Sequence, residues 1–134
     1  MKYLLDTNTC IFLMKNREAV VARYKANKKC GIAISSITVA ELYFGVYNSA
    51  SPEKNGENLT NFLLGFNIVD FDSTAASEYG RVRSALQKKG TLIGQFDMLI
   101  AAHAKSLGLI AVTNNTREFE RVEGLMLEDW YEGR

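Results

Sequence analysis

The sequence has little of several residue types that mark particular classes of protein. Its 134 residues include one proline, one histidine, one tryptophan and two cysteines. The cysteines, Cys10 and Cys30, have neither CxxC spacing nor histidine companions. This arrangement argues against a disulfide framework or a structural zinc site and favours free or buried thiols.

Long hydrophobic runs are also missing. No apolar stretch approaches the roughly 20 residues that are needed to cross a bilayer. The chain reaches Asp6 too early for the residues before it to form the core of a signal peptide. Hydrophobic residues make up 47% of the chain and charged residues 23%, which is typical of one soluble core. We therefore expect a single cytoplasmic domain over residues 1–134 with no membrane partner.

No excess charge of one sign is present. Sixteen Lys and Arg residues nearly balance fifteen Asp and Glu residues, and the formal net charge is +1. Basic residues nevertheless cluster, early at Lys15, Arg17, Arg23, Lys25, Lys28 and Lys29 and later at Arg81, Arg83, Lys88 and Lys89. A positive surface around an acidic pit and ordinary solvated helix faces both explain these clusters, so charge alone leaves nucleic-acid binding open.

Short apolar runs alternate with helical patterns along the chain. Strands are predicted at residues 3–5, 32–34, 67–69, 109–112 and 126–127. Helices are predicted at residues 10–14, 18–28, 37–47, 57–64 and 73–89, and through Asp97 to residue 107. Residues 48–56, which contain Pro52, are predicted to form a loop. This alternation predicts an α/β fold with a mostly parallel sheet and helices on both faces.

Four acidic residues and one asparagine fall where such a sheet would bring them together. Asp6 directly follows the first strand, and Asn115 and Glu118 follow the strand at 109–112. Glu41 lies within two turns of the start of the helix after the second strand, and Asp97 is near the start of its own helix. Because functional crevices in open parallel sheets lie beyond the carboxyl ends of the strands, we expect these side chains to converge there.

Converging carboxylates need a partner of opposite charge. Two carboxylates about 5 Å apart repel each other by roughly 3 kcal/mol at an effective dielectric constant of 20. Protonation or a bound cation would relieve this repulsion, and oxygen ligands alone favour Mg²⁺ or Mn²⁺. Such an ion lowers the pKa of a bound water and neutralises charge on a phosphate, which is the chemistry of phosphodiester hydrolysis.

Each acidic residue also has a simpler structural interpretation. Asp6 could cap the helix that follows it, and Asp97 could complement a helix dipole. Glu41 could be a half-buried acid paired with a lysine or arginine. Glu118 lies in residues 117–121, which are typical of a charged surface turn. Spacing alone leaves both interpretations open.

Four segments of the chain resemble the motifs of PIN domains, in the same order. They are Leu4-Leu5-Asp6-Thr7-Asn8; Ser35-Ser36-Ile37-Thr38-Val39-Ala40-Glu41-Leu42 with Gly45; Ile93-Gly94-Gln95-Phe96-Asp97-Met98-Leu99-Ile100-Ala101-Ala102-His103-Ala104; and Val112-Thr113-Asn114-Asn115-Thr116-Arg117-Glu118-Phe119. The likeness continues through Asp129-Trp130 and is closest to the VapC toxins. One motif would be weak support, but four in order over nearly the whole chain are specific.

The resemblance implies a PIN-like fold in which Asp6, Glu41 and Asp97 bind Mg²⁺ or Mn²⁺ at the sheet edge. Asn115 departs from the aspartate that the wider family often has at its position. By position we favour Glu118 as the fourth catalytic acid, with Asn115 holding a water or the substrate.

Two residues beside Asp6 are further candidates for positioning. From the same turn, Thr7 or Asn8 could steady the Asp6 carboxylate or orient a phosphate. His103, the only histidine, lies six residues past Asp97, and we expect it to be structural rather than catalytic.

The resemblance also implies a biological role. VapC-like chains are toxins of toxin–antitoxin systems that cleave structured RNA such as tRNA and thereby inhibit translation and growth. A homodimer and a VapB-type antitoxin are implied, with DNA contacted only through the antitoxin complex. Two alternatives stay open: a metal-dependent DNA or flap-type nuclease, and a catalytically silent RNA-binding module.

Overall fold

The computed structural model describes residues 1–132, so residues 133–134 of the predicted domain lie outside the described part. The strands are β1 (Tyr3–Leu5), β2 (Ile32–Ser35), β3 (Asn67–Val69), β4 (Ile110–Val112) and β5 (Leu127–Glu128). The helices are α1 (Thr7–Met14), α2 (Glu18–Asn27), α3 (Ser36–Tyr47), α4 (Pro52–Leu63), α5 (Ser73–Lys89), α6 (Gln95–Leu107) and α7 (Thr116–Phe119), with a 3-10 turn, η1 (Lys28–Cys30), after α2. The alternating order is the predicted one.

The strands form one sheet in the order β3-β2-β1-β4-β5, and every neighbouring pair is parallel. The chain builds outward from β1 to β3 on one side and then returns to place β4 and β5 on the other. The strand order therefore reverses between β1 and β4. Ligand sites of open α/β sheets lie at such a reversal, beyond the carboxyl ends of the strands.

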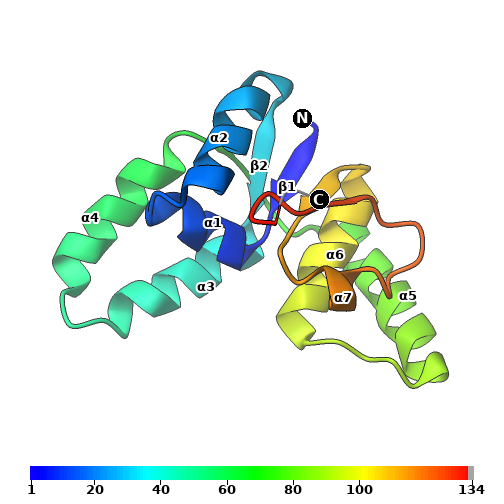
Figure 1. Cartoon of the computed structure of the whole chain (residues 1–134). Helices are drawn as coiled ribbons and strands as arrows, with labels where there is room; N and C mark the ends of the chain where they lie inside the picture. Colours follow the sequence, from blue (N-terminus) through cyan, green and yellow to red (C-terminus); the bar gives the residue numbers. More distant parts are fainter. Residues whose placement is uncertain (133–134) are drawn as a thin grey trace.

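Two hydrophobic cores cover the two faces of this sheet, as the predicted α/β fold requires. Figure 1 shows α1 to α4 on one side and α5 to α7 on the other. One core joins Leu4 of β1 to apolar side chains of α5 and α6, and the other joins Leu5 of β1 to those of α1 to α4. Because Leu4 and Leu5 are neighbours on a strand, their side chains point to opposite faces, and both are fully buried.

The predicted loop at residues 48–56 is wrong in its second half. Helix α4 begins at Pro52, so the connection from α3 is only residues 48–51. Proline is favourable in the first turn of a helix, where its missing N–H has no helical partner to lose. We had taken Pro52 as a loop marker, but it begins the helix.

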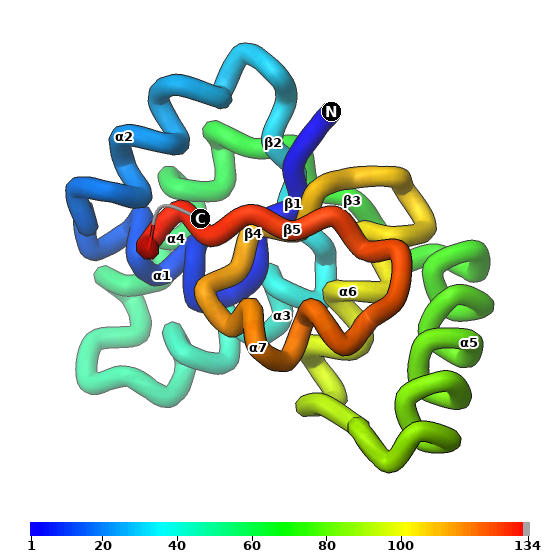
Figure 2. The backbone as a smooth tube through the Cα atoms, turned by 45° about the vertical axis from the view of Figure 1, so that its right-hand side comes forward, coloured from blue at the N-terminus to red at the C-terminus, as the bar shows by residue number. Residues whose placement is uncertain are grey.

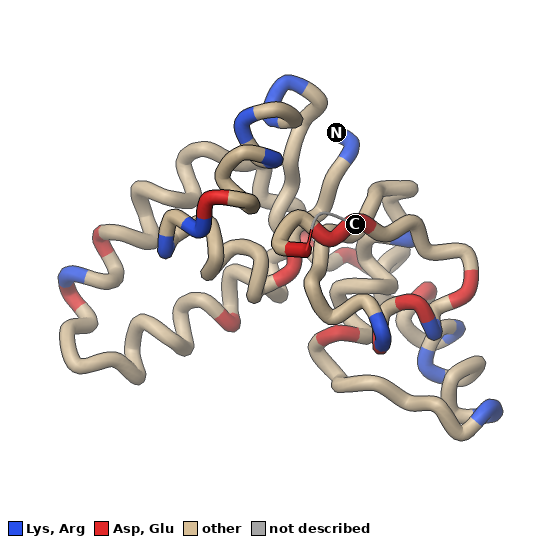
Figure 3. The backbone as a smooth tube through the Cα atoms, viewed as in Figure 1, with Lys and Arg blue, Asp and Glu red and all other residues tan. Residues whose placement is uncertain are grey.

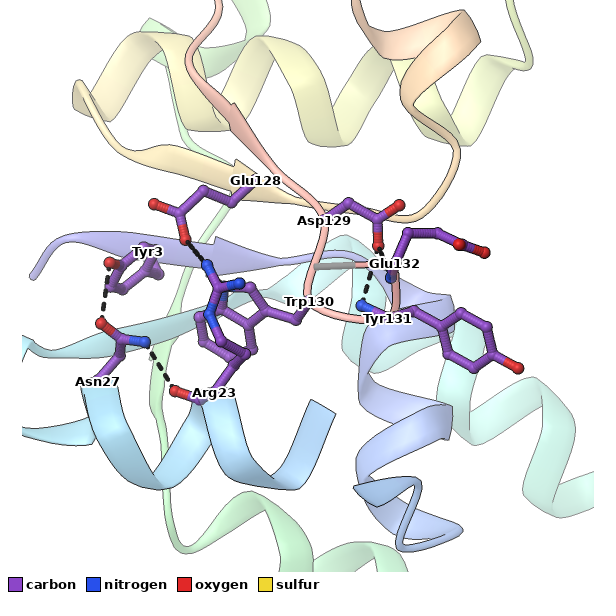
Figure 4. Close-up of polar contacts among 8 residues, drawn as sticks. All are labelled: Tyr3, Arg23, Asn27, Glu128, Asp129, Trp130, Tyr131 and Glu132. Carbon is purple, nitrogen blue, oxygen red and sulfur yellow. Dashed lines mark hydrogen bonds and ion pairs between the residues drawn. The ribbon is translucent and has the colours of Figure 1, made fainter. Parts of the chain in front are cut away.

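The C-terminal segment fastens the edge of the sheet. Figure 2 shows this segment crossing the molecule beside β4, with which β5 pairs. Glu128 Oε1 accepts a hydrogen bond from Trp130 Nε1 at 3.0 Å and forms an ion pair with Arg23 Nη2 of α2 at 2.9 Å (Figure 4). The Tyr3 hydroxyl donates to Asn27 Oδ1 at 3.1 Å on the same side. These contacts tie the last strand to β1 and α2.

Charge is distributed in separate patches. The two predicted basic clusters lie largely on α2 with η1 and on α5, on opposite sides of the sheet (Figure 3). Over residues 1–132, no helix has the length and apolar character of a membrane span. Cys10 is buried and Cys30 is exposed, and both are free thiols, as expected.

Candidate active site

The crevice between the ends of β1 and β4 contains the first predicted acid. The backbone N–H of Asp6 donates to the carbonyl oxygen of Val112 at 3.0 Å, so the two strands are still joined where they end. The Thr9 hydroxyl donates to the same carbonyl at 3.1 Å. These bonds fix the position of Asp6 at the point where the strand order reverses.

The carboxylate of Asp6 caps helix α1. Its Oδ1 accepts the backbone N–H of Thr9 at 2.9 Å, and the residue is only 4% exposed. Burial raises the pKa of Asp6, the hydrogen bonds of Thr113 and Thr9 lower it, and the negative charge of Glu41 raises it further. The capping interpretation is therefore confirmed, yet the same carboxylate lies within the field of a second acid.

Glu41 reaches this crevice from α3. The Ser35 hydroxyl begins that helix by accepting the N–H of Ile37 at 3.0 Å. One oxygen of the half-buried Glu41 accepts a hydrogen bond from the hydroxyl of Thr7. Within residues 1–132 no lysine or arginine forms an ion pair with Glu41, so the simpler interpretation as a salt-bridged helix acid is wrong. Thr7 holds Glu41 in place.

Asn115 joins the remaining two acids. Its Nδ2 donates to Asp97 Oδ2 at 3.0 Å and to Glu118 Oε2 at 2.7 Å. Because one amide group serves both carboxylates, the first turn of α6 and the short helix α7 are linked at the crevice. Glu118 is thus part of the acidic group, and the interpretation of residues 117–121 as a plain surface turn does not hold.

The pKa of Asp97 reports the combined field of the acids. Burial raises it to about 6, the hydrogen bond from Asn115 lowers it, and the charges of Asp6, Glu118 and Glu41 raise it. Each of the other three acids therefore acts on Asp97 across one crevice, although they come from β1, α3 and α7. The convergence predicted from sequence is present.

Two positioning residues were missed, and one predicted residue has a weaker place. Thr9 and Thr113 hold the Asp6 carboxylate, and Thr113 directly follows β4. Its place just after a buried strand was the only sequence signal for it. Asn8, which we predicted to position substrate or water, is exposed on α1. No hydrogen bond in the described part of the chain fixes its side chain.

The residues present suit a hard divalent cation. All four acids offer carboxylate oxygens, and the raised pKa of Asp97 shows a surplus of negative charge that a cation would neutralise. Among residues 1–132, no three acidic, histidine or cysteine side chains are already gathered closely enough to enclose an ion. Mg²⁺ does not require such a cluster, because it is usually held by one or two carboxylates together with waters and substrate phosphates.

Comparison with known proteins agrees with this geometry. The family model described as PIN domain matches residues 3–125. A VapC named tRNA(fMet)-specific endonuclease from Shigella flexneri is 47% identical over 131 residues, which cover 97% of this chain and 98% of that protein. The chain belongs to the VapC family of PIN-domain proteins. A ribonuclease VapC from Haemophilus influenzae strain 86-028NP is 46% identical, with 97% of this chain and 98% of that protein covered.

Solved VapC-family structures have the same fold. The DNA-bound VapBC of Salmonella typhimurium contains a chain that is 45% identical, with a TM-score of 0.92 and coverage of 97% of this chain and 98% of that one. VapBC2 of Rickettsia felis, bound to a promoter DNA fragment, gives 39% identity and a TM-score of 0.92, with coverage of 97% and 99%. The predicted PIN-like fold is confirmed.

Proposed function

We propose that this chain is a divalent-metal-dependent endoribonuclease that hydrolyses phosphodiester bonds in structured RNA. The observation that carries this proposal is the convergence of Asp6, Glu41, Asp97 and Glu118 at the strand reversal, where their charges act on one another. Mg²⁺ is the favoured metal and Mn²⁺ the alternative, because every available ligand is a hard oxygen.

Each residue of the site has a distinct proposed role. Asp6, Glu41 and Asp97 would hold the cation, and a cation bound there supplies Lewis-acid neutralisation of phosphate charge and acidifies water. Asn115 holds the Asp97 and Glu118 side chains in one orientation through its amide. Thr7 fixes one oxygen of Glu41 and leaves the other to face the crevice.

Glu118 and Asn8 complete the proposed site. Glu118 is the fourth acid, and its carboxylate can accept a proton or a water hydrogen bond near Asp97. Asn8 lies exposed on the first turn of α1, where its amide can donate to a phosphate oxygen.

The relatives supply the substrate class and the biological setting. Because VapC proteins of Shigella flexneri and Salmonella typhimurium are named tRNA(fMet)-specific endonucleases, we propose tRNA as the substrate class. Cleavage of tRNA would stop translation and growth, which is the action of a toxin in a toxin–antitoxin system. The chain would act in the cytoplasm.

The partners follow from the same family. Related VapC chains were solved as VapBC complexes, so we propose a VapB-type antitoxin as the cognate inhibitor. Two of those complexes contain DNA, and we propose that this chain meets DNA only through the antitoxin. A homodimer is the proposed state of the toxin itself.

The test is cleavage by the purified full chain. Total RNA and a matched DNA oligonucleotide are incubated with Mg²⁺, and the cleaved ends are mapped after brief reaction. Asp6→Ala and Asp97→Asn are expected to abolish RNA cleavage and growth inhibition while the circular dichroism spectrum stays unchanged. Removal of the ion with EDTA should have the same effect, and Mn²⁺ should restore activity.

Three results would overturn the proposal. Cleavage of DNA but not RNA would indicate a DNA or flap-type nuclease. RNA binding without turnover in Mg²⁺ would indicate a catalytically silent binding module. Unchanged turnover in both acidic-site variants would show that the chemistry lies elsewhere.

A further inference from the structure

A groove of about 730 Å³ leads away from Glu41 between α1, α3 and α4. Its volume is that of a ligand site rather than of a packing gap. Glu41 lies at one end, so the groove is continuous with the candidate active site. The structural roles described so far do not use this space.

Gly45 opens the groove along α3. It lies four residues after Glu41 and therefore on the same face of the helix. A Cβ atom added at Gly45 would meet no atom within 4 Å, and the residue lines the groove. Glycine is unfavourable inside a helix, so the gap that it leaves here has no packing benefit to explain it.

The facing wall carries a row of amide side chains. Asn55, Asn58 and Asn61 follow each other at three-residue spacing on α4, and all three line the groove. Asn16, at the end of α1, adds a fourth amide with its backbone in the left-handed region at φ 57°. Each amide offers both hydrogen-bond donors and an acceptor. Asn55 already donates to Ser49 Oγ at 2.9 Å, while Asn58 and Asn61 are exposed.

Between the amides, the groove has apolar walls and one positive charge. Leu42, Val46 and Phe62 line it, and Lys15 is its one cationic lining residue among residues 1–132. A nucleobase has apolar faces and a polar edge, and unpaired RNA bases are bound in proteins by stacking and by hydrogen bonds to those edges. Lys15 can pair with a phosphate of the same strand.

We propose that this groove is a subsite for unpaired RNA nucleotides that extend from the bond cut near Glu41. This inference rests on the proposed ribonuclease function and names the residues that read the strand. Asn58 and Asn61 contact base edges, Phe62 contacts a base face, and Lys15 contacts the backbone. Gly45 keeps the path open next to the acidic site.

Unpaired RNA explains this lining better than a peptide does. The groove is continuous with the site that would cut RNA, so a substrate strand must pass its mouth. Two successive free amides and a lysine match the edges and phosphates of nucleotides. The only acidic lining residue is Glu41, which is part of the proposed metal site.

The experiment measures RNA binding without turnover in the full-length Asp97→Asn protein. A fluorescently labelled, short single-stranded RNA is titrated by anisotropy in Mg²⁺. Adding Gly45→Leu, which fills the open path, is expected to raise the Kd about tenfold or more. Adding Asn58→Ala together with Asn61→Ala should raise it by a similar factor and flatten any preference among RNAs that differ in sequence.

Gly80→Leu is the matched control. Gly80 is also an exposed helical glycine with no atom within 4 Å of an added Cβ, but it lies on α5 and does not line the groove. Its Kd should equal that of the Asp97→Asn parent. Circular dichroism and thermal melts of all variants establish that each protein is folded.

The outcomes separate this inference from the function on which it rests. If the parent binds RNA and the unsubstituted chain cleaves it, while the groove variants bind RNA as tightly as the parent, the subsite is overturned and the ribonuclease stands. If those variants lose only the binding of a VapB-type antitoxin, the groove holds a peptide and the inference is wrong. If the unsubstituted chain neither binds nor cleaves RNA, the proposed function itself has failed.

Discussion

His103 Nδ1 lies 2.8 Å from Ser35 Oγ, and both side chains are buried. The Ser35 hydroxyl also accepts the N–H of Ile37 and so begins the helix that carries Glu41. His103 is on α6, the helix that begins beside Asp97. One hydrogen bond in the interior therefore joins the two helices that bring acids to the crevice from opposite faces of the sheet.

We expect His103→Ala to destabilise the fold rather than to remove a catalytic group. His103 is 1% exposed, and its ring also packs edge-on against Phe71 at a centroid distance of 5.2 Å. Loss of the ring would leave a cavity and a buried hydroxyl with one partner fewer, which costs about 3 kcal/mol. Urea unfolding measures this loss, and turnover per folded molecule should stay within about tenfold of the wild type. A thousandfold loss in a folded variant would assign His103 to the chemistry.

His103 also makes stability depend on pH. Burial lowers the pKa of His103 from its ordinary value of 6.5, although the charges of Asp72 and Asp70 and the backbone carbonyl of Asp70 oppose that effect. The unfolded chain therefore takes up this proton first as the pH falls. The free energy of unfolding contributed by neutral His103 is present above about pH 6.5 and is lost below it.

The comparison with His103→Asn isolates this contribution. An asparagine can bond Ser35 but does not titrate, so its stability should change less than that of the wild type between about pH 7.5 and pH 5.5. Urea unfolding at several pH values gives the difference directly. Parallel curves for the two proteins would show that His103 titrates alike in the folded and unfolded states.

The C-terminal anchor gives a prediction about stability alone. Trp130 is 1% exposed and packs edge-on against Tyr3 of β1, with ring centroids 5.3 Å apart. Trp130→Ala should lower the free energy of unfolding by about 3–5 kcal/mol, a large part of the stability of a small domain. Chemical denaturation measures it. Met126→Ala, at a side chain that is 51% exposed, serves as the surface control and should change stability by less than about 0.5 kcal/mol.

The ion pair beneath this anchor should matter far less. Arg23 and Glu128 are 2.9 Å apart, but their side chains are 35% and 25% exposed. Solvent screening limits such a pair to about 1 kcal/mol or less. Arg23→Met is therefore expected to unfold at nearly the wild-type denaturant concentration. A loss as large as that of Trp130→Ala would mean that the charge, rather than the indole, holds the last strand.

Sequence reasoning worked best where a residue's neighbours along the chain determine its structure. The strands β1 and β4 are short apolar runs, and Gly108 ends α6 with φ at 67°, so their positions could be predicted. The start of α4 could not be predicted reliably, because proline is equally at home in a loop and at the first position of a helix.

The parts of the site that were missed depend on contacts between distant segments. Thr113 supports Asp6, and Thr7 supports Glu41 across 34 positions of sequence. A threonine after a strand or in the first turn of a helix has many ordinary uses, so its type and spacing do not reveal its partner. The acids themselves were predictable because the topology of a parallel sheet brings the ends of its strands to one edge.

Asn115 gives the sharpest test of the acidic crevice. Its Nδ2 is the only donor that the described chain supplies to both Asp97 and Glu118. Asn115→Asp replaces that donor by a third carboxylate, so both hydrogen bonds are lost and charge repulsion is added. In EDTA we expect the free energy of unfolding to fall by about 2 kcal/mol, and Mg²⁺ should restore more of it than it adds to the wild type.

Asn115→Ala separates the lost hydrogen bonds from the added charge. It removes the donor without adding a carboxylate, so it should be destabilised in EDTA but should gain no more from Mg²⁺ than the wild type gains. Thermal melts of the three proteins across a Mg²⁺ titration measure both effects. Equal Mg²⁺ responses in the aspartate and alanine variants would mean that no cation is bound beside Asp97 and Glu118, and the metal-dependent mechanism would have to be abandoned.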